Sequence, residues 1–213
     1  MNNKFETKEK LKPNEWWRRL CQVGDRIHLC GDLPHPHWEP EAATEQLTQW
    51  VNAGVTHIVD VRGEASDAKW VGLTQPDITY IHLGTHDNGG AQDFRWFDQG
   101  VQAIVKALED PDAQIVVHCH MGINRAPSMV FAALLKLGYG IQPALNAIRT
   151  ARPISGIIYA EDAVRWYGHR NNWGETEIFV AREEVKQWHK DNPVDVGWVI
   201  SRIRIAEMET TWA

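Results

Sequence analysis

The fold of this chain is constrained most by an alternation of β-rich runs with helix-forming segments. Residues 55–63 (VTHIVDVRG) and 113–119 (AQIVVHC) are almost continuously β-branched and apolar, as expected of strands covered on both faces. Helical patterns precede them at residues 40–54 and 94–110. This alternation predicts an α/β fold with a central, mainly parallel sheet flanked by helices.

The remaining elements of the predicted fold are shorter. Residues 25–33 and 78–84 have the composition of strands. Three helices are expected in succession over residues 126–140, 141–153 and 159–169, and the first has a Pro in its first turn and a Gly at its end. The residues between these elements are rich in turn formers.

A chain of 213 residues is expected to form one domain with extensions. Residues 1–24 are expected to be a polar N-terminal segment, and residues 25–170 the main domain. Residues 171–213 are expected to form an α+β extension that packs on the domain or on a partner. Within it the pattern predicts a helix at 182–190 and a strand in GWVISRIRI, residues 197–205.

Composition restricts the partners and the compartment. The net charge of −6 is spread along the chain, so no nucleic-acid or anionic-membrane partner is expected. The three cysteines, Cys21, Cys30 and Cys119, are an odd number, which favours a reducing compartment, and a cytoplasmic location is predicted. No segment has the apolar length of a signal peptide core or a membrane span.

Tryptophan is abundant, with eleven residues. Six of them lie where exposure is expected from the pattern, and we expect these to pack the chain ends onto the core rather than to anchor a partner: Trp16, Trp17, Trp38, Trp173, Trp188 and Trp212.

The candidate site lies in HCHMGINR, residues 118–125. Cys119 ends a β-run, and a Pro-initiated helix starts directly after Arg125. A tight loop between a strand and a helix turns backbone N–H groups inward at the positive end of the helix, which suits a phosphate dianion and a cysteine thiolate. Arg125 can hold two phosphoryl oxygens with its planar fork. The pattern predicts that Cys119 is a nucleophile that forms a phosphocysteine.

The phosphate-binding residues predicted with this arrangement are His120, Met121, Gly122, Ile123, Asn124 and Arg125.

A metal centre is the alternative interpretation of His118, Cys119 and His120. Three consecutive residues that enter a turn cannot all converge on one tetrahedral ion. His35 and His37, in PHPHW, are expected to form a turn rather than a ligand pair. We therefore predict no metal and no cofactor.

Residues 118–125 resemble the His-Cys-x-x-Gly-x-x-Arg signature of the cysteine-dependent protein tyrosine phosphatases, and are most similar to the dual-specificity branch. The resemblance extends over residues 25–170. It implies hydrolysis of phosphotyrosine in proteins, with phosphoserine or phosphothreonine as further substrates. It also implies that His118 organises the loop and that His120 contributes its backbone N–H.

The resemblance further implies a general acid on the loop after the third strand. Asp87 matches that position, and Asp93 in the same loop is the rival. Asp87 is favoured because Asp93 stands where the N-cap of the next helix is expected.

The chain departs from the family pattern directly after the arginine. Ser or Thr is usual there, whereas this chain has Ala126, as in the phosphatases of regenerating liver. In the family this hydroxyl hydrogen-bonds the departing cysteine sulfur, so its absence implies slow turnover with a long-lived intermediate. Ser128 is expected to face elsewhere and not to take over this role. No Lys or Arg lies between Cys119 and Arg125, which disfavours a highly charged substrate.

Several alternatives stay open. Arg62 and Lys69 are either substrate contacts or ordinary solvated charges. A phosphate-binding module with little activity is the second hypothesis, and a rhodanese-like sulfur transferase or an arsenate reductase is the third. Cys21 or Cys30 is a candidate for a protective disulfide with Cys119. The expected partner is a phosphorylated protein or another phosphomonoester.

Overall fold

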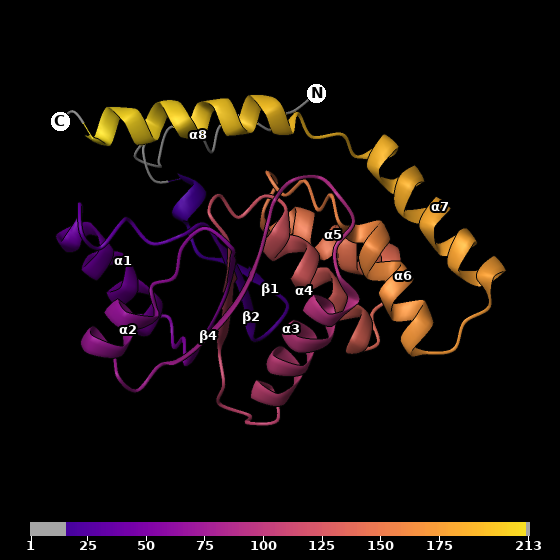
Figure 1. Ribbon diagram of the computed structural model, residues 1–213, viewed down its shortest axis with the longest axis horizontal. Helices are drawn as coiled ribbons and strands as arrows, with labels where there is room; N and C mark the ends of the chain where they lie inside the picture. Colours follow the sequence, from indigo (N-terminus) through magenta and orange to yellow (C-terminus); the bar gives the residue numbers. More distant parts are fainter. Residues whose placement is uncertain (1–15, 212–213) are drawn as a thin grey trace.

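A computed structural model describes residues 16–211 of the chain and contains a five-stranded sheet between two groups of helices (Figure 1). The strand order is β1-β2-β5-β3-β4, in which β1 is antiparallel to β2 and the other neighbours are parallel. The predicted α/β fold with a mainly parallel sheet is confirmed. The strands are β1 (Cys21–Val23), β2 (Ile27–Cys30), β3 (His57–Arg62), β4 (Thr79–Thr85) and β5 (Ile115–His118).

Helices cover both faces of the sheet. One face packs against α3 (Phe94–Ala107), α4 (Arg125–Lys136), α5 (Ile141–Ala151) and α6 (Ala160–Arg170), and the other against α1 (Pro40–Asn52) and α2 (Ala68–Thr74) (Figure 1). Each face has its own apolar core. Phe97, Ile104 and Phe131 are fully buried in the first core, and Leu47 and Trp50 are buried in the second.

The central position of β5 fixes where a site can form. Its residues pair with β2 on one side and with β3 on the other, and all four are buried. Because β2, β5, β3 and β4 run in the same direction, the loops that follow them gather at one edge of the sheet. In open α/β sheets this carboxyl edge is where ligands bind.

Two elements were not predicted. Residues 21–23, within the segment expected to be a polar N-terminal tail, form the edge strand β1. Residues 68–74 form α2 in a stretch with a turn-rich composition. Both are short, and both gain their stability from packing: Val23 lies in the first core and Val71 in the second.

The strand predicted in residues 197–205 is wrong, because these residues belong to helix α8 (Val196–Thr211). Val199, Ile203 and Ala206 lie on one face of the helix and are buried against Trp17 and Ile123. Their spacing of four and three residues is helical, and burial of this face outweighs the β-propensity of Val and Ile.

The helix predicted at residues 182–190 is longer, since α7 spans Glu175–Asp191. Ala181, Val185 and Trp188 bury one face of α7 in the first core, beside α5 and α6. The C-terminal extension is thus helical in its described part, and not α+β. Figure 1 shows α8 after a linker from α7, lying along the top of the molecule in that view.

The tryptophans follow the expectation with one exception. Trp17 and Trp188 are buried, and Trp16 and Trp173 are partly buried against the cores. Trp38 is 75% exposed. Trp212 lies outside the described residues. None of the described helices has the length and apolar character needed to cross a membrane.

Candidate active site

The loop between β5 and α4 begins at Cys119, which is 2% exposed. Its tightest point is Gly122, whose φ of +62° favours glycine. A Cβ at this position would lie 2.5 Å from the carbonyl oxygen of Cys30 and 2.6 Å from the guanidinium of Arg152. The loop therefore closes in this shape only with glycine at position 122.

Four successive carbonyls of the loop are held from outside. They accept hydrogen bonds as follows: His120 from Asp32 N (2.8 Å), Met121 from Arg152 Nη2 (2.9 Å), Gly122 from Arg152 Nε (2.7 Å) and Ile123 from Gly156 N (2.8 Å).

In a planar trans peptide the C=O of one residue and the N–H of the next point in opposite directions. The N–H groups of residues 121–124 consequently face the inner side of the loop. Within the described part of the chain, no N–H of residues 120–124 has a hydrogen-bond acceptor. This inward set of donors suits an anion with several oxygen atoms.

Arg152 is a site residue that sequence reasoning missed. It is 1% exposed, and its guanidinium also donates to the carbonyl of Trp17 at 2.5 Å. Its position continues the buried face of α5, four residues after Ile148 and seven after Leu145. A charged residue on that apolar face was the signal in the sequence.

Arg125 is the first residue of α4 and its side chain is 4% exposed. Nη1 and Nη2 donate to the two carboxylate oxygens of Glu64 at 2.5 and 2.6 Å, and Nη1 also donates to the carbonyl of Thr85 at 2.9 Å. Burial works against the charge of Arg125, but Glu64 raises the pKa of the guanidinium.

A guanidinium has five N–H groups, and these contacts use three. The two that remain, on Nε and Nη2, lie along one edge of the group. Nε has no hydrogen-bond partner among the described residues. This edge can bind two oxygens of one phosphate.

Asp87 is brought to the same place from the loop after β4. Its carboxylate accepts hydrogen bonds from the hydroxyl of Tyr159 at 2.7 Å and from Nδ2 of Asn124 at 3.2 Å. Its Oδ2 lies 3.8 Å from Nε of Arg125. Sequence reasoning missed Tyr159, which is 2% exposed and also accepts from the N–H of Gly89.

Asp93 lies apart from this group and caps α3. Its Oδ1 accepts a hydrogen bond from the N–H of Arg95 at 2.8 Å, and its carboxylate forms an exposed ion pair with the Arg95 side chain. The N-cap position predicted for Asp93 is confirmed.

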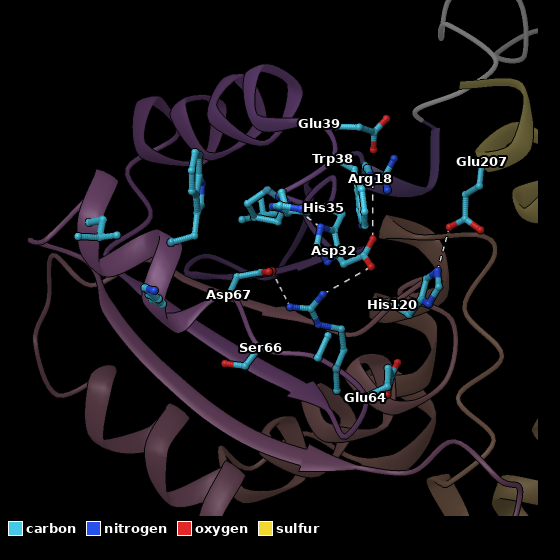
Figure 2. A pocket seen from close by; sticks show the side chains of 18 residues that line it. Arg18, Asp32, His35, Trp38, Glu39, Glu64, Ser66, Asp67, His120 and Glu207 are labelled. Atoms are coloured by element: carbon cyan, nitrogen blue, oxygen red, sulfur yellow. Dashed lines mark hydrogen bonds and ion pairs between the residues drawn. The ribbon is translucent and has the colours of Figure 1, made fainter. Parts of the chain in front are cut away.

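His118 is fully buried below the loop, against Trp50. Burial lowers the pKa of His118 to about 4, so the imidazole is neutral at physiological pH. Its Nε2 lies 3.8 Å from Oδ1 of Asp60. His120 points the other way, toward α8, where its Nε2 lies 2.8 Å from Oε1 of Glu207 (Figure 2).

Arg62 is buried rather than turned to solvent. It donates to Asp60 at 2.8 Å and to Asp67 at 2.5 Å, and its Nη1 lies 3.5 Å from Asp32. Ligand atoms of Asp60, Asp67 and His118 lie within 4.8 Å of one another. Because the guanidinium of Arg62 bonds both carboxylates, it already supplies the positive charge that a cation would bring there.

Ala126 is fully buried in the core cluster behind the loop. Ser128, two residues later, accepts a hydrogen bond from the backbone N–H of Tyr159 at 3.2 Å. Its hydroxyl is therefore occupied in fixing the segment that carries Tyr159.

Comparison with known proteins points to one family. A sequence model of the dual specificity phosphatase catalytic domain matches residues 40–158. Human dual specificity protein phosphatase 26 is 28% identical over 109 residues, which are 49% of this chain and 49% of that protein, and the bovine protein matches equally. The chain spans about half the length of these curated relatives.

Solved structures support the fold. Human DUSP28 has a TM-score of 0.56 at 17% identity, covering 71% of this chain and 95% of its own. A mouse putative dual specificity phosphatase, solved with zinc tungstate, also has a TM-score of 0.56 at 17% identity, covering 76% and 91%. With the family match over more than half of its residues, this chain belongs to the dual specificity phosphatases.

Proposed function

We propose that this chain is a cysteine-dependent phosphatase that hydrolyses phosphotyrosine, and also phosphoserine or phosphothreonine, in proteins. The observation that carries the proposal is the row of inward N–H groups at residues 121–124, completed by the unused Nε and Nη2 edge of Arg125. Six donors around one position match the oxygen atoms of a phosphoryl group. Cys119 begins this loop, in line with the positive end of α4.

In the first step, the thiolate of Cys119 attacks phosphorus. The S–P bond forms as the bond from phosphorus to the leaving oxygen breaks, and Asp87 donates a proton to that oxygen. The loop N–H groups and Arg125 stabilise the charge on the three equatorial oxygens. The contacts of Asp87 with Tyr159 and Asn124 support its assignment as the acid, because they hold it over the loop.

In the second step, water attacks the phosphocysteine, Asp87 accepts the proton, and the S–P bond breaks to release phosphate and the thiolate. A hydroxyl after the arginine would assist the departing sulfur, and Ala126 has none. We therefore propose that this step is slow and that the intermediate accumulates. The buried, neutral His118 is assigned to organising the loop from below.

The proposed catalytic domain is residues 25–170, to which the edge strand β1 (Cys21–Val23) adds from the N-terminal segment 1–24, and segment 171–213 follows it. The match of the family to residues 40–158 lies inside this range. A cytoplasmic location is proposed on the basis of the three unpaired cysteines.

A second candidate is a phosphate-binding module with little activity, which the Ala126 position favours. The two differ in whether the S–P bond forms. The module would bind inorganic phosphate or tungstate in the loop without releasing an alcohol from a phosphomonoester.

Stopped-flow hydrolysis of p-nitrophenyl phosphate tests the proposal. The wild type is expected to give a burst of nitrophenol close to one equivalent, followed by slow turnover. Cys119→Ser should give no burst, and Ala126→Ser should accelerate the slow phase. A wild type that binds phosphate but releases no nitrophenol would support the binding module, and a wild-type rate in Cys119→Ser would rule out the mechanism.

A further inference from the structure

A large groove opens beside the candidate active site. Its volume is about 940 Å³, and its walls are the loop at residues 32–39 and the segment at residues 64–73. His120 and Glu64 lie at its active-site end, as Figure 2 shows. His120 follows Cys119 in the chain, and Glu64 holds Arg125. A peptide whose phosphate lies in the loop, and whose backbone continues on this side, would enter the groove directly.

The charged side chains at the floor of the groove form ion pairs with one another. Asp32 lies 3.6 Å from Arg18 and 3.5 Å from Arg62, and Arg62 also bonds Asp67 (Figure 2). Burial raises the pKa of Asp32 to about 6. The two arginines of the lining are thus occupied by carboxylates and are not disposed to bind a further anion.

The rim of the groove has a different character. Trp38, on the loop at residues 32–39, is 75% exposed, and Leu73, on the segment at residues 64–73, is 73% exposed. Glu39, beside Trp38, has no ion-pair partner among the described residues. The rim therefore offers apolar surface together with an unpaired carboxylate.

The charges at the active-site end of the groove are also paired. Glu64 pairs with Arg125, and Glu207 lies 2.8 Å from His120. Among the described residues, Glu39 remains the lining carboxylate without a cation and attracts a basic side chain, and Lys69 is the one lining cation left for a polyanionic headgroup.

We propose that this groove binds the residues flanking the phosphotyrosine of a substrate peptide, with an apolar side chain against Trp38 and Leu73 and a Lys or Arg at Glu39. The inference rests on the proposed function, because it assumes that the phosphate occupies the loop beside the groove. It assigns a substrate class by chemistry: phosphopeptides with neighbouring apolar and basic residues, in preference to phosphoinositides.

The first test measures binding without turnover. Cys119→Ser protein is titrated with two fluorescein-labelled phosphotyrosine peptides of equal length, one flanked by Leu and Lys and the other by Ser and Glu. Fluorescence anisotropy is expected to show tighter binding of the Leu/Lys peptide. Adding Trp38→Ala should lower the affinity for the Leu/Lys peptide about tenfold, which corresponds to ~1.4 kcal/mol. The affinity for the Ser/Glu peptide should change much less.

Matched variants separate the groove from general damage. Phe179→Ala removes another exposed aromatic side chain, 60% exposed on α7 and outside the groove, and is expected to bind both peptides as the parent protein does. Glu39→Lys should reverse the preference between Lys and Glu flanks. Circular dichroism melting of each variant checks that the exposed substitutions leave the fold intact.

The second test uses active protein and compares kcat/KM for the Leu/Lys peptide with that for p-nitrophenyl phosphate. Trp38→Ala and Leu73→Ala should each lower this ratio several-fold. Equal affinity of Cys119→Ser for the two peptides, unaltered by Trp38→Ala, would overturn the groove proposal. The proposal would also be overturned if Trp38→Ala weakened the binding of a soluble phosphoinositide and left the binding of the peptides unchanged. Failure of the wild type to hydrolyse p-nitrophenyl phosphate would instead overturn the proposed function, and the anisotropy titration would still decide the groove.

Discussion

Two buried arginines, Arg62 and Arg125, occupy neighbouring places at the carboxyl edge of the sheet, with side chains equally 4% exposed. Arg62 bonds Asp60 and Asp67 and lies near Asp32, so its donors are directed at three carboxylates. Arg125 bonds one carboxylate, Glu64, whose side chain is 45% exposed, and its Nε lies 3.8 Å from Asp87, which is 30% exposed.

The difference separates a structural cation from one able to bind a ligand. Burial by itself would lower the pKa of Arg62, but Asp60 and Asp67 raise it, and the remaining donor atom, Nη1, lies 3.5 Å from Asp32. Arg125 is held in position on one edge and keeps the other for a ligand. Burial of the guanidinium alone therefore does not mark a functional arginine. The carboxylates around Arg62 are 0–14% exposed, whereas Glu64 and Asp87 beside Arg125 are 45% and 30% exposed and can turn aside when an anion binds.

The largest expected effect is the contrast between removing each arginine. Arg125→Ala should lower kcat/KM for p-nitrophenyl phosphate on the order of 10³-fold, since it removes two donors to the transition state. Its free energy of unfolding should change little, because Glu64 can turn to solvent. Steady-state kinetics and urea denaturation measure the two quantities.

Arg62→Ala should show the opposite balance. It leaves Asp60 and Asp67 buried without their cation, and breaking such a pair costs about 3–5 kcal/mol of the free energy of unfolding. Urea denaturation measures this loss directly. If Arg62→Ala unfolds as the wild type does while losing activity, the division between a structural and a ligand-binding arginine is wrong.

The next effect concerns the pH dependence of stability around Arg62. His118 has a folded pKa of about 4, below its ordinary value, so between pH 6.5 and 4 the unfolded chain binds a proton that the folded chain does not. This contribution therefore makes the protein less stable as the pH falls through that window. Asp32 has a folded pKa of about 6, above its ordinary value, so between pH 6 and 4 the folded chain binds the extra proton. This second contribution makes the protein more stable as the pH falls.

In the wild type these two contributions oppose each other. Asp32→Asn removes the contribution of Asp32. When the pH is lowered from 6.5 to 4, the free energy of unfolding of this variant should therefore drop by about 3 kcal/mol more than that of the wild type. Urea denaturation at several pH values provides the comparison. Parallel pH curves for the two proteins would contradict the assigned shifts.

A smaller effect is expected at Tyr159, on the acid side of the site. Tyr159→Phe removes the hydrogen bond to Asp87 and should lower kcat/KM, which reports the first step, about tenfold for phenyl phosphate, because its leaving oxygen needs protonation. The loss for p-nitrophenyl phosphate, a much better leaving group, should be smaller. In an Asp87→Asn background the substitution should cost little more, and full additivity would show that Tyr159 does not act through Asp87.

The local parts of this site were predictable from sequence. The β-run, the glycine and the Pro-initiated helix place Cys119 and Arg125 at the two ends of one loop, because each element follows from neighbouring residues. The cap at Asp93 follows from the same kind of local pattern.

The supporting residues were not predictable, because their partners are distant in the chain. Glu64 lies 61 residues from Arg125, and Tyr159 lies 72 from Asp87. Only the sheet order, which brings the ends of β3, β4 and β5 together, makes them neighbours. Helix α8 was mistaken for a strand for a related reason, since its burial against Trp17 and Ile123 decides its conformation.

The central claim is that Cys119 carries a phosphoryl group between the two steps, and trapping it is the most direct measurement. Wild-type protein is mixed with excess p-nitrophenyl phosphate, quenched with acid during slow turnover, digested and analysed by mass spectrometry. The account predicts a phosphoryl group on the peptide that contains Cys119, at high occupancy in the wild type and lower occupancy in Ala126→Ser. Hydrolysis that proceeds with Cys119 unmodified throughout, or with the phosphoryl group on another residue, would contradict it.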